Sequence, residues 1–468
     1  MSALRTFPWR SLVYYFVTGL ILIIPAFINK VPLVFSDTGT YLGSASTLFP
    51  PVDRPIGYGF IIRATGWQAS IWPVVIFQGM LSSWLIRRTM QTLFPAMGPN
   101  WRPHVVALVL LLLVSSLPWY ASQIMPDVFT GLVALGVFLL LFGRRMGVLE
   151  RCFLVVMLFF AIMAHLSHAW MVLLVIVVWA FAMRGQRYFM RLRVQLVTAL
   201  LLPLVASGFI VAYNAGHGYG AVLSPTSDLF LAGKLIESGA MRIHLDRTCR
   251  TDTAYLCAQR KELLENAAHY VWSEQAPTRM GNDLVTSSER LRPVVRSLLA
   301  DPYMWGVLVW KSFIATCSQL VHVEIGAGLS PYREESAPWW PMSAHYAHEL
   351  PHYLASHQQR GGWDLSTINR VNYVVLALSV LMIALAWPVR RRVRWHAFMF
   401  LMVGMVVANA AITGALANVY DRLQARITWV VVLGALLLVA DWNRHRRSYL
   451  AELEARLRAF DRTSETKT

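Results

Sequence analysis

Long apolar blocks separated by short polar gaps make up most of this chain, and its first half is nearly continuous apolar sequence. A membrane-spanning helix needs roughly 20 apolar residues, with a range of about 17–25. By this measure the blocks predict ten spans, at residues 11–29, 68–86, 103–120, 127–143, 152–166, 168–183, 194–213, 371–389, 396–416 and 426–442. The pattern therefore predicts an all-α polytopic membrane protein.

One further block, at residues 303–322, is apolar enough to be an eleventh span. Counting it makes the total odd and reverses the sidedness of the last spans. Either this block is interfacial or re-entrant, or another crossing is hidden within 324–370. Lys311 inside the block favours an interfacial or partner-packed helix. We therefore expect about 10–11 transmembrane helices, together with interfacial helices.

The polar gaps divide the chain into four expected regions. The longest gap begins at 214, and its apolar spacing over Asp228–Ser238 and Gln259–Glu274 predicts a partly helical insertion at the outer face. The regions are an N-terminal transmembrane module of about seven spans at 1–213, outer-face loops at 214–370, C-terminal transmembrane helices at 371–442 and a cytoplasmic tail at 443–468.

Composition and charge support this assignment. The chain is 56% hydrophobic and only 14% charged, whereas soluble domains carry about 25% charged residues. The net charge of +17 is concentrated in short gaps between apolar blocks, which is a positive-inside signal and not a nucleic-acid surface. The basic clusters are Arg5 and Arg10; Arg87 and Arg88; Arg144, Arg145 and Arg151; Arg184, Arg187, Arg191 and Arg193; Arg390, Arg391, Arg392 and Arg394; and Arg444, Arg446 and Arg447. Placing these clusters inside predicts cytoplasmic N- and C-termini, in a bacterial-type inner (plasma) membrane.

The four cysteines are of two kinds. Cys152 and Cys317 lie in apolar blocks and are expected to be small buried hydrophobic residues. Cys249 and Cys257 lie in a polar loop that the topology places outside. If that loop is periplasmic, we expect a short-range disulfide between them, because that compartment is oxidising. Two free thiols are the alternative, and the spacing lacks the partners of a metal site.

Aromatic and histidine residues crowd the segment 338–363. Aromatic side chains at a bilayer surface commonly form an interfacial belt. A surface for carbohydrate or lipid headgroups is the alternative interpretation.

Carboxylates are scarce in the first half, which makes Asp37 and Asp127 conspicuous. Both are expected at outer ends of spans, where charge at the edge of hydrocarbon suggests function. Asp37 follows the first block, with Tyr41 one helical turn later, and is a candidate general base for an acceptor hydroxyl. Each carboxylate could instead cap a helix. Together they resemble an acid/base or metal-binding pair.

Further polar residues are expected on the same outer side. Arg54 follows Asp53, and this dipeptide is either a contribution to a site or a surface ion pair. His165 and His168 share a helix face, where they could hold a phosphate when charged, hold a metal when neutral, or cap a turn. Candidate substrate contacts at the start of the last span are Asp421, Arg422 and Arg426. Arginine suits phosphate through its planar fork, although Asp421 could neutralise Arg422 instead.

Several common catalytic motifs are absent. The sequence contains no P-loop, no GxSxG elbow, no HExxH and no dinucleotide fingerprint. ATP-driven transport and serine hydrolysis by a nucleophile elbow therefore have no support in the sequence.

This layout resembles the GT-C superfamily of polytopic glycosyltransferases, which use polyprenyl-phosphate-linked sugars at the outer face of the membrane. Members place an acidic residue in the first outer loop, as Asp37 is placed here, and many place another in the second outer loop, as Asp127 is. Tyr420-Asp421-Arg422 is similar, in permuted order, to a late Asp-Arg-Tyr element. The resemblance covers mainly 1–213 and the last spans. The first loop lacks the adjacent Asp-Glu pair of protein mannosyltransferases, so a protein acceptor is not supported.

The resemblance implies a mechanism and partners. A lipid-linked sugar would enter from the bilayer, and Asp37 would accept the proton of a lipid or glycan acceptor hydroxyl during direct, inverting attack. Arg422, Arg426 or His168 would stabilise the departing lipid phosphate. Asp127 would position the acceptor or a divalent cation, and no nucleotide would be required.

Two other functions remain open. A transporter or flippase of a lipid-linked glycan would place polar groups near the midplane, for which Gln78, Asn409 and Thr413 are the candidates. A polymerase or ligase of surface polysaccharide would use arginine and histidine in large outer loops, which 214–370 could supply.

Overall fold

The computed structural model describes residues 9–66, 68–143, 145–185, 189–249, 256–258, 260, 263, 266–387 and 393–465, with side chains as far as Arg444. Of the basic clusters, Arg5, Arg144, Arg187 and Arg390–Arg392 lie outside the described residues, as do the side chains of Arg446 and Arg447.

Helices account for nearly all of the regular structure, and 75% of the protein is helical. The described residues contain a single isolated parallel bridge, between Leu33 and Gln123, and no strand. The helices are α1 (Trp9–Leu22), α2 (Ile24–Asn29), α3 (Thr38–Thr47), α4 (Gly57–Gly66), α5 (Trp72–Leu93), η1 (Pro95–Met97), α6 (Arg102–Val114), α7 (Leu117–Ala121), η2 (Pro126–Val128), α8 (Phe129–Phe142), α9 (Val148–Met163), α10 (Leu166–Met183), η3 (Phe189–Leu192), α11 (Arg193–Gly216), α12 (Ser227–Glu237), α13 (Ala240–Thr248), α14 (Ala267–Trp272), α15 (Leu284–Ala300), α16 (Pro302–Val321), α17 (Trp339–His345), α18 (Leu350–Leu354), α19 (His357–Gly361), α20 (Ser366–Ala386), α21 (Val393–Leu416) and α22 (Asp421–Glu465).

Six helical segments in the described part of the chain are long and apolar enough to cross a membrane, judged by length and composition. These segments are α10, Met190–Gly216 with α11, α16, α20, α21 and Asp421–Arg444 of α22. Three shorter apolar helices accompany them, at Trp9–Leu22, Arg102–Val114 and Pro126–Phe142. The protein is therefore an all-α, multi-pass membrane protein.

Some expected spans are interrupted because proline disfavours a helix interior. The first expected span is divided into α1 and α2, and Pro25 stands in the first turn of α2. The third is divided into α6 and α7, with Pro118 in the first turn of α7. The second is α5, which carries Arg87 and Arg88 close to its end. Two further expected spans, at 127–143 and 152–166, form helices α8 and α9 of only 14 and 16 residues. Five of the ten expected spans therefore meet the length and composition of a complete span, and α16 is the sixth helix that does.

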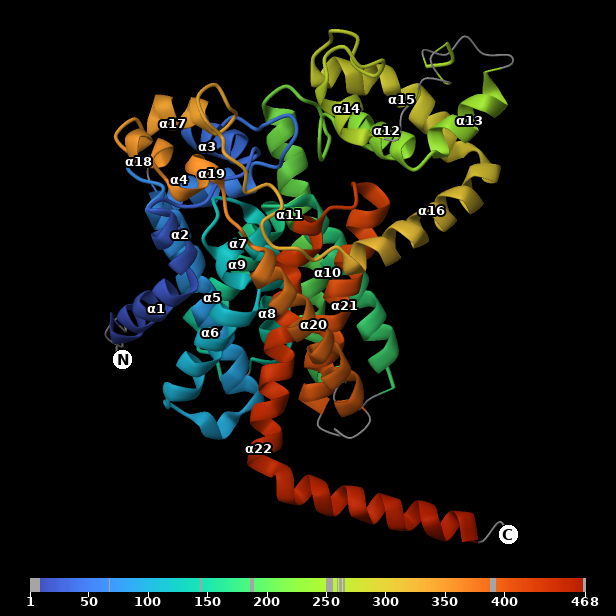
Figure 1. Cartoon of the computed structure of the whole chain (residues 1–468). Coiled ribbons are helices and arrows are strands. Elements are labelled where there is room, and N and C mark those ends of the chain that lie inside the picture. The colour runs from blue at the N-terminus through green and yellow to red at the C-terminus, as the bar shows by residue number, and fades with distance from the viewer. Residues whose placement is uncertain are drawn as a thin grey trace.

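Two separate hydrophobic cores organise the molecule. The larger lies among the helices of the bundle and includes Leu132, Phe138, Phe398 and Trp429. The smaller lies within the insertion formed by α12–α15, which stands apart from the bundle in Figure 1, and includes Leu229 and Leu291. The insertion is thus a packed unit and not an extended loop.

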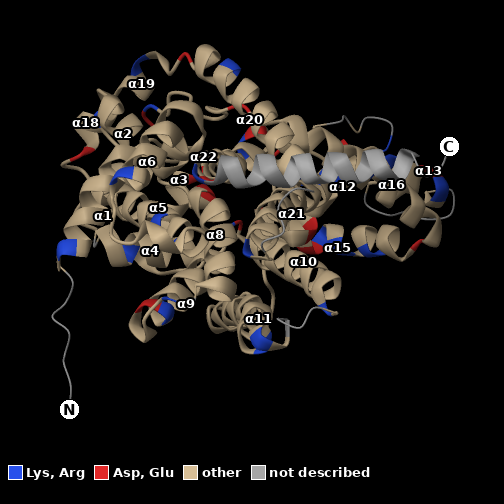
Figure 2. Cartoon of the chain, turned by 90° about the horizontal axis from the view of Figure 1, so that it is seen from below, with Lys and Arg blue, Asp and Glu red and all other residues tan. Residues whose placement is uncertain are grey.

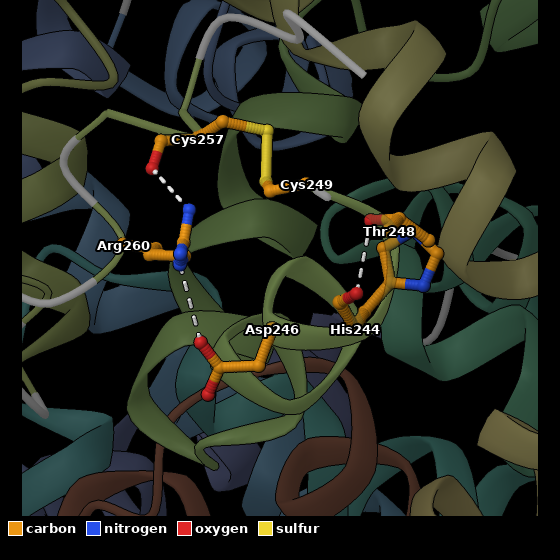
Figure 3. Close-up of a disulfide and its surroundings, with 6 residues drawn as sticks. All are labelled: His244, Asp246, Thr248, Cys249, Cys257 and Arg260. Atoms are coloured by element: carbon orange, nitrogen blue, oxygen red, sulfur yellow. Dashed lines mark hydrogen bonds and ion pairs between the residues drawn. A yellow bond between two sulfur atoms is a disulfide. The ribbon is translucent and has the colours of Figure 1, made fainter. Parts of the chain in front are cut away.

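A disulfide joins Cys249 to Cys257, the pairing expected from the sequence (Figure 3). Arg260 lies beside it, donates to the Cys257 carbonyl at 3.4 Å and forms an ion pair with Asp246 at 3.4 Å. The bond therefore closes a short loop at the edge of the insertion. The two other cysteines, Cys152 and Cys317, are exposed and not buried as expected. Both are on apolar helices at positions that do not face the core.

Residues 303–322 form α16, which runs from the insertion back towards the bundle (Figure 1). Its first part packs against α13 and α15. At its other end, Gln319 exchanges two hydrogen bonds with the Tyr420 backbone at the start of α22. The most extensive packing of α16 is against α21, and by length and composition α16 is one of the six helices able to cross a membrane.

Several arginines lie at one end of the bundle. At one end, Arg145 donates to the Pro95 carbonyl at 3.0 Å and Arg394 donates to the Thr92 carbonyl at 3.4 Å. Arg88 forms an ion pair with Glu150 near the same loop. Figure 2, seen from below, shows arginine and lysine on several helices at this end. We call it the basic end, and we call the opposite end, where α22 begins, the site end.

Candidate functional site

A short backbone crossing at the site end brings Asp37 and Asp127 close together. The Leu33 amide donates to the Ser122 carbonyl at 2.9 Å, and the Ile124 amide donates to the Leu33 carbonyl at 2.9 Å. Thr38 then donates its hydroxyl to the Ile124 carbonyl at 3.0 Å. Loops that follow two different helices are therefore held side by side, and each one carries a carboxylate.

Buried amides fix these loops from below and from above. The Gln78 side chain in α5 donates to the carbonyls of Ala121 and Gln123 at 3.0 and 2.9 Å. Gln358 in α19 bonds to both backbone groups of Val34, at 3.1 and 2.8 Å. Because satisfied buried polar groups hold a backbone in one arrangement, both loops are fixed in position.

Five charged side chains meet at this point and form what we call the charge network. Arg54 Nη2 lies 2.9 Å from Asp37 Oδ2, and Arg422 Nη1 lies 3.2 Å from the same oxygen. Arg422 Nη1 is also 4.0 Å from Asp127 Oδ2, and Arg426 Nη1 donates to Asp127 Oδ1 at 2.9 Å. The network therefore alternates in sign from Arg54 through Asp37, Arg422 and Asp127 to Arg426.

Exposure divides the charge network into two parts. The side chains of Arg54, Asp37 and Arg422 are 20%, 13% and 15% exposed, and we call them the exposed half. Asp127 and Arg426 are 2% and 0% exposed and form the buried pair. Three arginines and two carboxylates leave one positive charge, so the exposed half is suited to bind an anion.

The electrostatics of Asp37 are set by its two arginines. Burial alone raises the pKa of a carboxyl group, but the charges of Arg54 and Arg422 outweigh it and hold the pKa of Asp37 below its usual value. Asp37 is therefore ionised at neutral pH.

Helix capping does not explain either carboxylate. Asp37 occupies the N-cap position of α3 but makes no side-chain capping bond, and its Oδ2 faces the arginines instead. Asp127 lies in η2, ahead of α8, and its side chain pairs with Arg426. The side chains of Asp37 and Asp127 therefore pair with arginines and do not serve only as helix caps.

Arg422 is anchored independently of Asp37. Its guanidinium lies over the ring of Phe35, with 4.0 Å from the central carbon to the ring centroid, which is a cation–π contact. Tyr120 donates its hydroxyl to the Arg422 carbonyl at 3.3 Å. Gly328, at φ +81°, packs so closely against the Phe35 ring that a Cβ atom at this position would overlap it. No pattern in the sequence indicated Phe35 or Gly328 as part of the site.

Arg426 is held by groups from three other elements. Besides Asp127, it donates through Nη2 to Ser167 at 3.3 Å and to Asn409 at 3.1 Å. Within the described residues, Arg426 Nε and Asp127 Oδ2 have no hydrogen-bond partner. From the sequence, Asn409 was a candidate only for transport, and Ser167 was not a candidate. The sequence signal that could have placed Asn409 in the site was a polar asparagine within an apolar span.

Arg54 and Tyr41 complete the surroundings of Asp37. Arg54 forms its ion pair with Asp37 and contacts Asp53 through the backbone carbonyl at 3.0 Å, so it is not a surface pair with the Asp53 side chain. Phe230 of the insertion lies 5.9 Å from the Arg54 guanidinium. Tyr41 is 1% exposed and packs edge-on against Tyr58. It therefore belongs to the wall beneath the network.

The two histidines hold the start of α10. His165 accepts a bond from the Ser167 amide at 3.3 Å as the N-cap, and His168 bonds to Thr130 at 2.9 Å and the Ala161 carbonyl at 2.7 Å. Burial, with the nearby charge of Arg426, holds the pKa of His165 well below its usual value. His165 is therefore neutral, which favours the turn-capping alternative over a charged phosphate ligand.

Asp421 lies outside the charge network. It accepts a hydrogen bond from the Glu324 amide at 3.1 Å and so fixes the loop that follows α16. Arg422 is neutralised by Asp37 and Asp127, and not by its neighbour Asp421. The alternative interpretation, in which Asp421 neutralises Arg422, is therefore not supported. Arg422 and Arg426 were expected to share a helix face, and in the structure both lie next to Asp127.

A cation site is not evident in the described part of the chain. No group of three or more His, Cys, Asp or Glu residues there is arranged to hold a metal ion. Asp37 and Asp127 each face arginine, which disfavours a second cation in the same place.

Comparison with known proteins adds one structural match. No protein-family model and no curated protein matches the sequence. Among solved structures, the chain is similar to the crystal structure of ArnT from Cupriavidus metallidurans bound to undecaprenyl phosphate. The identity is 14%, the alignment covers 92% of this chain and 78% of that chain, and the TM-score is 0.33.

Proposed function

We propose that the protein transfers a hexose or pentose from a polyprenyl-phosphate donor to a lipid or glycan acceptor at the site end of the bundle. The observation that carries this proposal is the exposed half of the charge network, where a carboxylate lies between two arginines. A positioned base for the acceptor hydroxyl and fixed cations for the leaving phosphate are the groups that this reaction requires.

The reaction is a direct displacement. The acceptor oxygen forms a bond to the anomeric carbon as its proton passes to an Asp37 oxygen. The bond from the anomeric carbon to the phosphate oxygen breaks, and its electron pair stays on the phosphate. Attack from the face opposite the phosphate inverts the anomeric centre. Arg54 and Arg422 stabilise the charge that develops on the phosphate.

The charge of the site matches this reaction. The network carries one net positive charge, and a phosphodiester donor carries one negative charge. During transfer the phosphate gains a negative charge while Asp37 loses its own by accepting the proton. The total charge at the site therefore stays constant, which limits the electrostatic cost of the step in a partly buried environment.

The remaining predicted site residues are assigned to positioning. Asp127 and Arg426 are too deeply buried to meet a lipid phosphate directly, so they hold α22 where Arg422 reaches the exposed half. Tyr41, His165 and His168 shape the wall and the start of α10.

We assign the basic end to the cytoplasm on the positive-inside rule. The site end then faces outward, both termini are cytoplasmic, and the setting is the inner membrane of a bacterial-type cell envelope.

The polar residues that transport would require are used otherwise. Gln78 holds the loop at 121–123, and Asn409 bonds to Arg426 and to the Leu423 carbonyl. Thr413 donates to the Asn409 carbonyl at 2.7 Å. Their side chains support the site through these hydrogen bonds, so glycosyl transfer is favoured over transport.

The experiment compares Asp37→Asn with Asp421→Asn in cells that lack the endogenous gene. Surface lipids and glycans are profiled by mass spectrometry, and the amount of each variant in the membrane is measured. We expect Asp37→Asn to lose transfer by a factor of about 10² or more, because the proton acceptor is removed. Asp421→Asn lies on the same side but outside the network, and should retain the product. A normal profile with stable Asp37→Asn would exclude Asp37 as the base.

A further inference from the structure

One oxygen of Asp37 serves two arginines. Oδ2 lies 2.9 Å from Arg54 and 3.2 Å from Arg422, whereas among the described residues Oδ1 accepts only a 3.4 Å bond from Ser36. Two guanidinium groups that converge on one oxygen form the arrangement by which proteins bind phosphate. A carboxylate held in this way is also a poor proton acceptor, since both arginines favour its charged form.

We propose that Asp37 is an internal competitor for the phosphate site. In the protein without donor, its carboxylate occupies the position between Arg54 and Arg422 that the donor phosphate takes. The phosphate displaces the carboxylate, and only then is Asp37 free to accept a proton. This inference rests on the proposed function and adds an order of events to it.

The arginines have other contacts that keep them in place when Asp37 leaves. Arg422 lies on the Phe35 ring and near Asp127, and its backbone is bound by Tyr120. Arg54 donates to the Asp53 carbonyl at 3.0 Å. The phosphate site is therefore formed before the donor arrives, so binding does not require the arginines to reorganise.

Asp37 itself can move at little cost. Although it stands at the N-cap of α3, its side chain makes no capping bond that would be lost. The backbone beneath it is fixed by Thr38, which accepts from the Phe35 amide at 2.9 Å and donates to the Ile124 carbonyl at 3.0 Å. A rotation of the Asp37 side chain alone therefore exchanges one anion for another.

Competition has a consequence for the order of the reaction. Without donor phosphate, Asp37 remains paired and does not deprotonate an acceptor or a water molecule. With the phosphate bound, the base is released beside the sugar that it serves. The site thus links activation of the acceptor to the presence of the donor.

The test measures binding and does not depend on turnover. The full-length protein is placed in nanodiscs of neutral phosphatidylcholine, and undecaprenyl phosphate, undecaprenol and inorganic phosphate are the probes. Asp37→Asn should bind undecaprenyl phosphate more tightly than the wild type, by on the order of tenfold, because a competing charge is removed. Undecaprenol binding should not change. Tightening for inorganic phosphate as well would show that the arginines recognise phosphate alone, and tightening only for the lipid would show that the chain is also required.

Two controls make the result decisive. Asp421→Asn removes a carboxylate beside Arg422 that does not pair with it, and its affinity should equal that of the wild type. Asp37→Ser is a second, smaller neutral replacement and should show the same gain if Asp37→Asn does not fold. Equal or weaker binding of undecaprenyl phosphate by both folded variants would overturn the competition. An inactive Asp37→Asn with unchanged affinity would leave the proposed transfer standing, so the two failures are distinguishable.

Discussion

The exposed half and the buried pair contain the same chemical groups in different surroundings. In both, a carboxylate pairs with arginine at 2.9–3.2 Å. The side chains of the exposed half are 13–20% exposed, whereas those of the buried pair are 0–2% exposed. A partly exposed pair can exchange partners with a ligand, whereas a buried pair is strongly destabilised when one partner is lost. Burial therefore separates a reactive role from a structural role within one connected network.

The largest effect should follow from breaking the buried pair. We expect Arg426→Ala to reduce the free energy of unfolding by about 3–5 kcal/mol, since Asp127 is left charged and unpaired in a buried site. Arg54→Ala removes an arginine from the exposed half and should cost about 1 kcal/mol or less. Thermal unfolding of the purified proteins in detergent compares the two.

A double replacement tests whether the buried charge is the cause. Asp127→Leu with Arg426→Met removes both charges, and stability should recover most of the loss. If the double variant is as unstable as Arg426→Ala, then the bonds of Arg426 to Ser167 and Asn409 matter more than its pairing with Asp127.

A smaller loss of stability should follow from disturbing the close contact between α8 and α22 beside the buried pair. A Cβ atom at Gly131 would lie 2.5 Å from the Trp429 ring, so α8 and α22 approach closely beside Asp127 and Arg426. Gly131→Ala should therefore cost about 1–3 kcal/mol of stability through overpacking. Gly208→Ala in α11 is the matched control, because a Cβ there meets no atom within 4 Å, and its unfolding midpoint should not fall. Equal behaviour of the two variants would show that the contact at Gly131 is not constraining.

The sequence predicted the members of the charge network better than their pairing. Sidedness placed Asp37, Asp127, Arg422 and Arg426 at one end, because span lengths and arginine clusters are local signals. The pairs Arg422–Asp37 and Arg426–Asp127 join residues 385 and 299 positions apart. Such pairing depends on the Leu33–Gln123 crossing, for which periodicity contains no signal.

Two local sequence patterns acquire long-range contacts that the sequence alone does not indicate. Asp37 before Thr38 has the sequence of an N-cap, and tertiary contact with two arginines directs its side chain elsewhere. A long-range contact therefore overrides the local preference of Asp37. The block at 303–322 has the composition of a span, and in the structure it contacts the insertion, α21 and Tyr420.

The smallest expected effect, on the order of one pH unit, concerns the acid limb of activity in the exposed half. In the free protein, Arg54 and Arg422 hold the pKa of Asp37 below its usual value, so the carboxylate loses its charge only as the pH falls through that lowered pKa. Donor phosphate displaces the Asp37 carboxylate from between the two arginines, and the pKa of Asp37 then rises. The acid limb of kcat, which reports the complex, should therefore lie at higher pH than the limb of kcat/KM for the donor, which reports the free protein. Arg54→Gln removes one of the two charges from the free protein and should bring the limbs closer together by raising the lower one. Coincident limbs in the wild type would mean that Asp37 keeps both arginines throughout the reaction, and the exposed half would then resemble the buried pair.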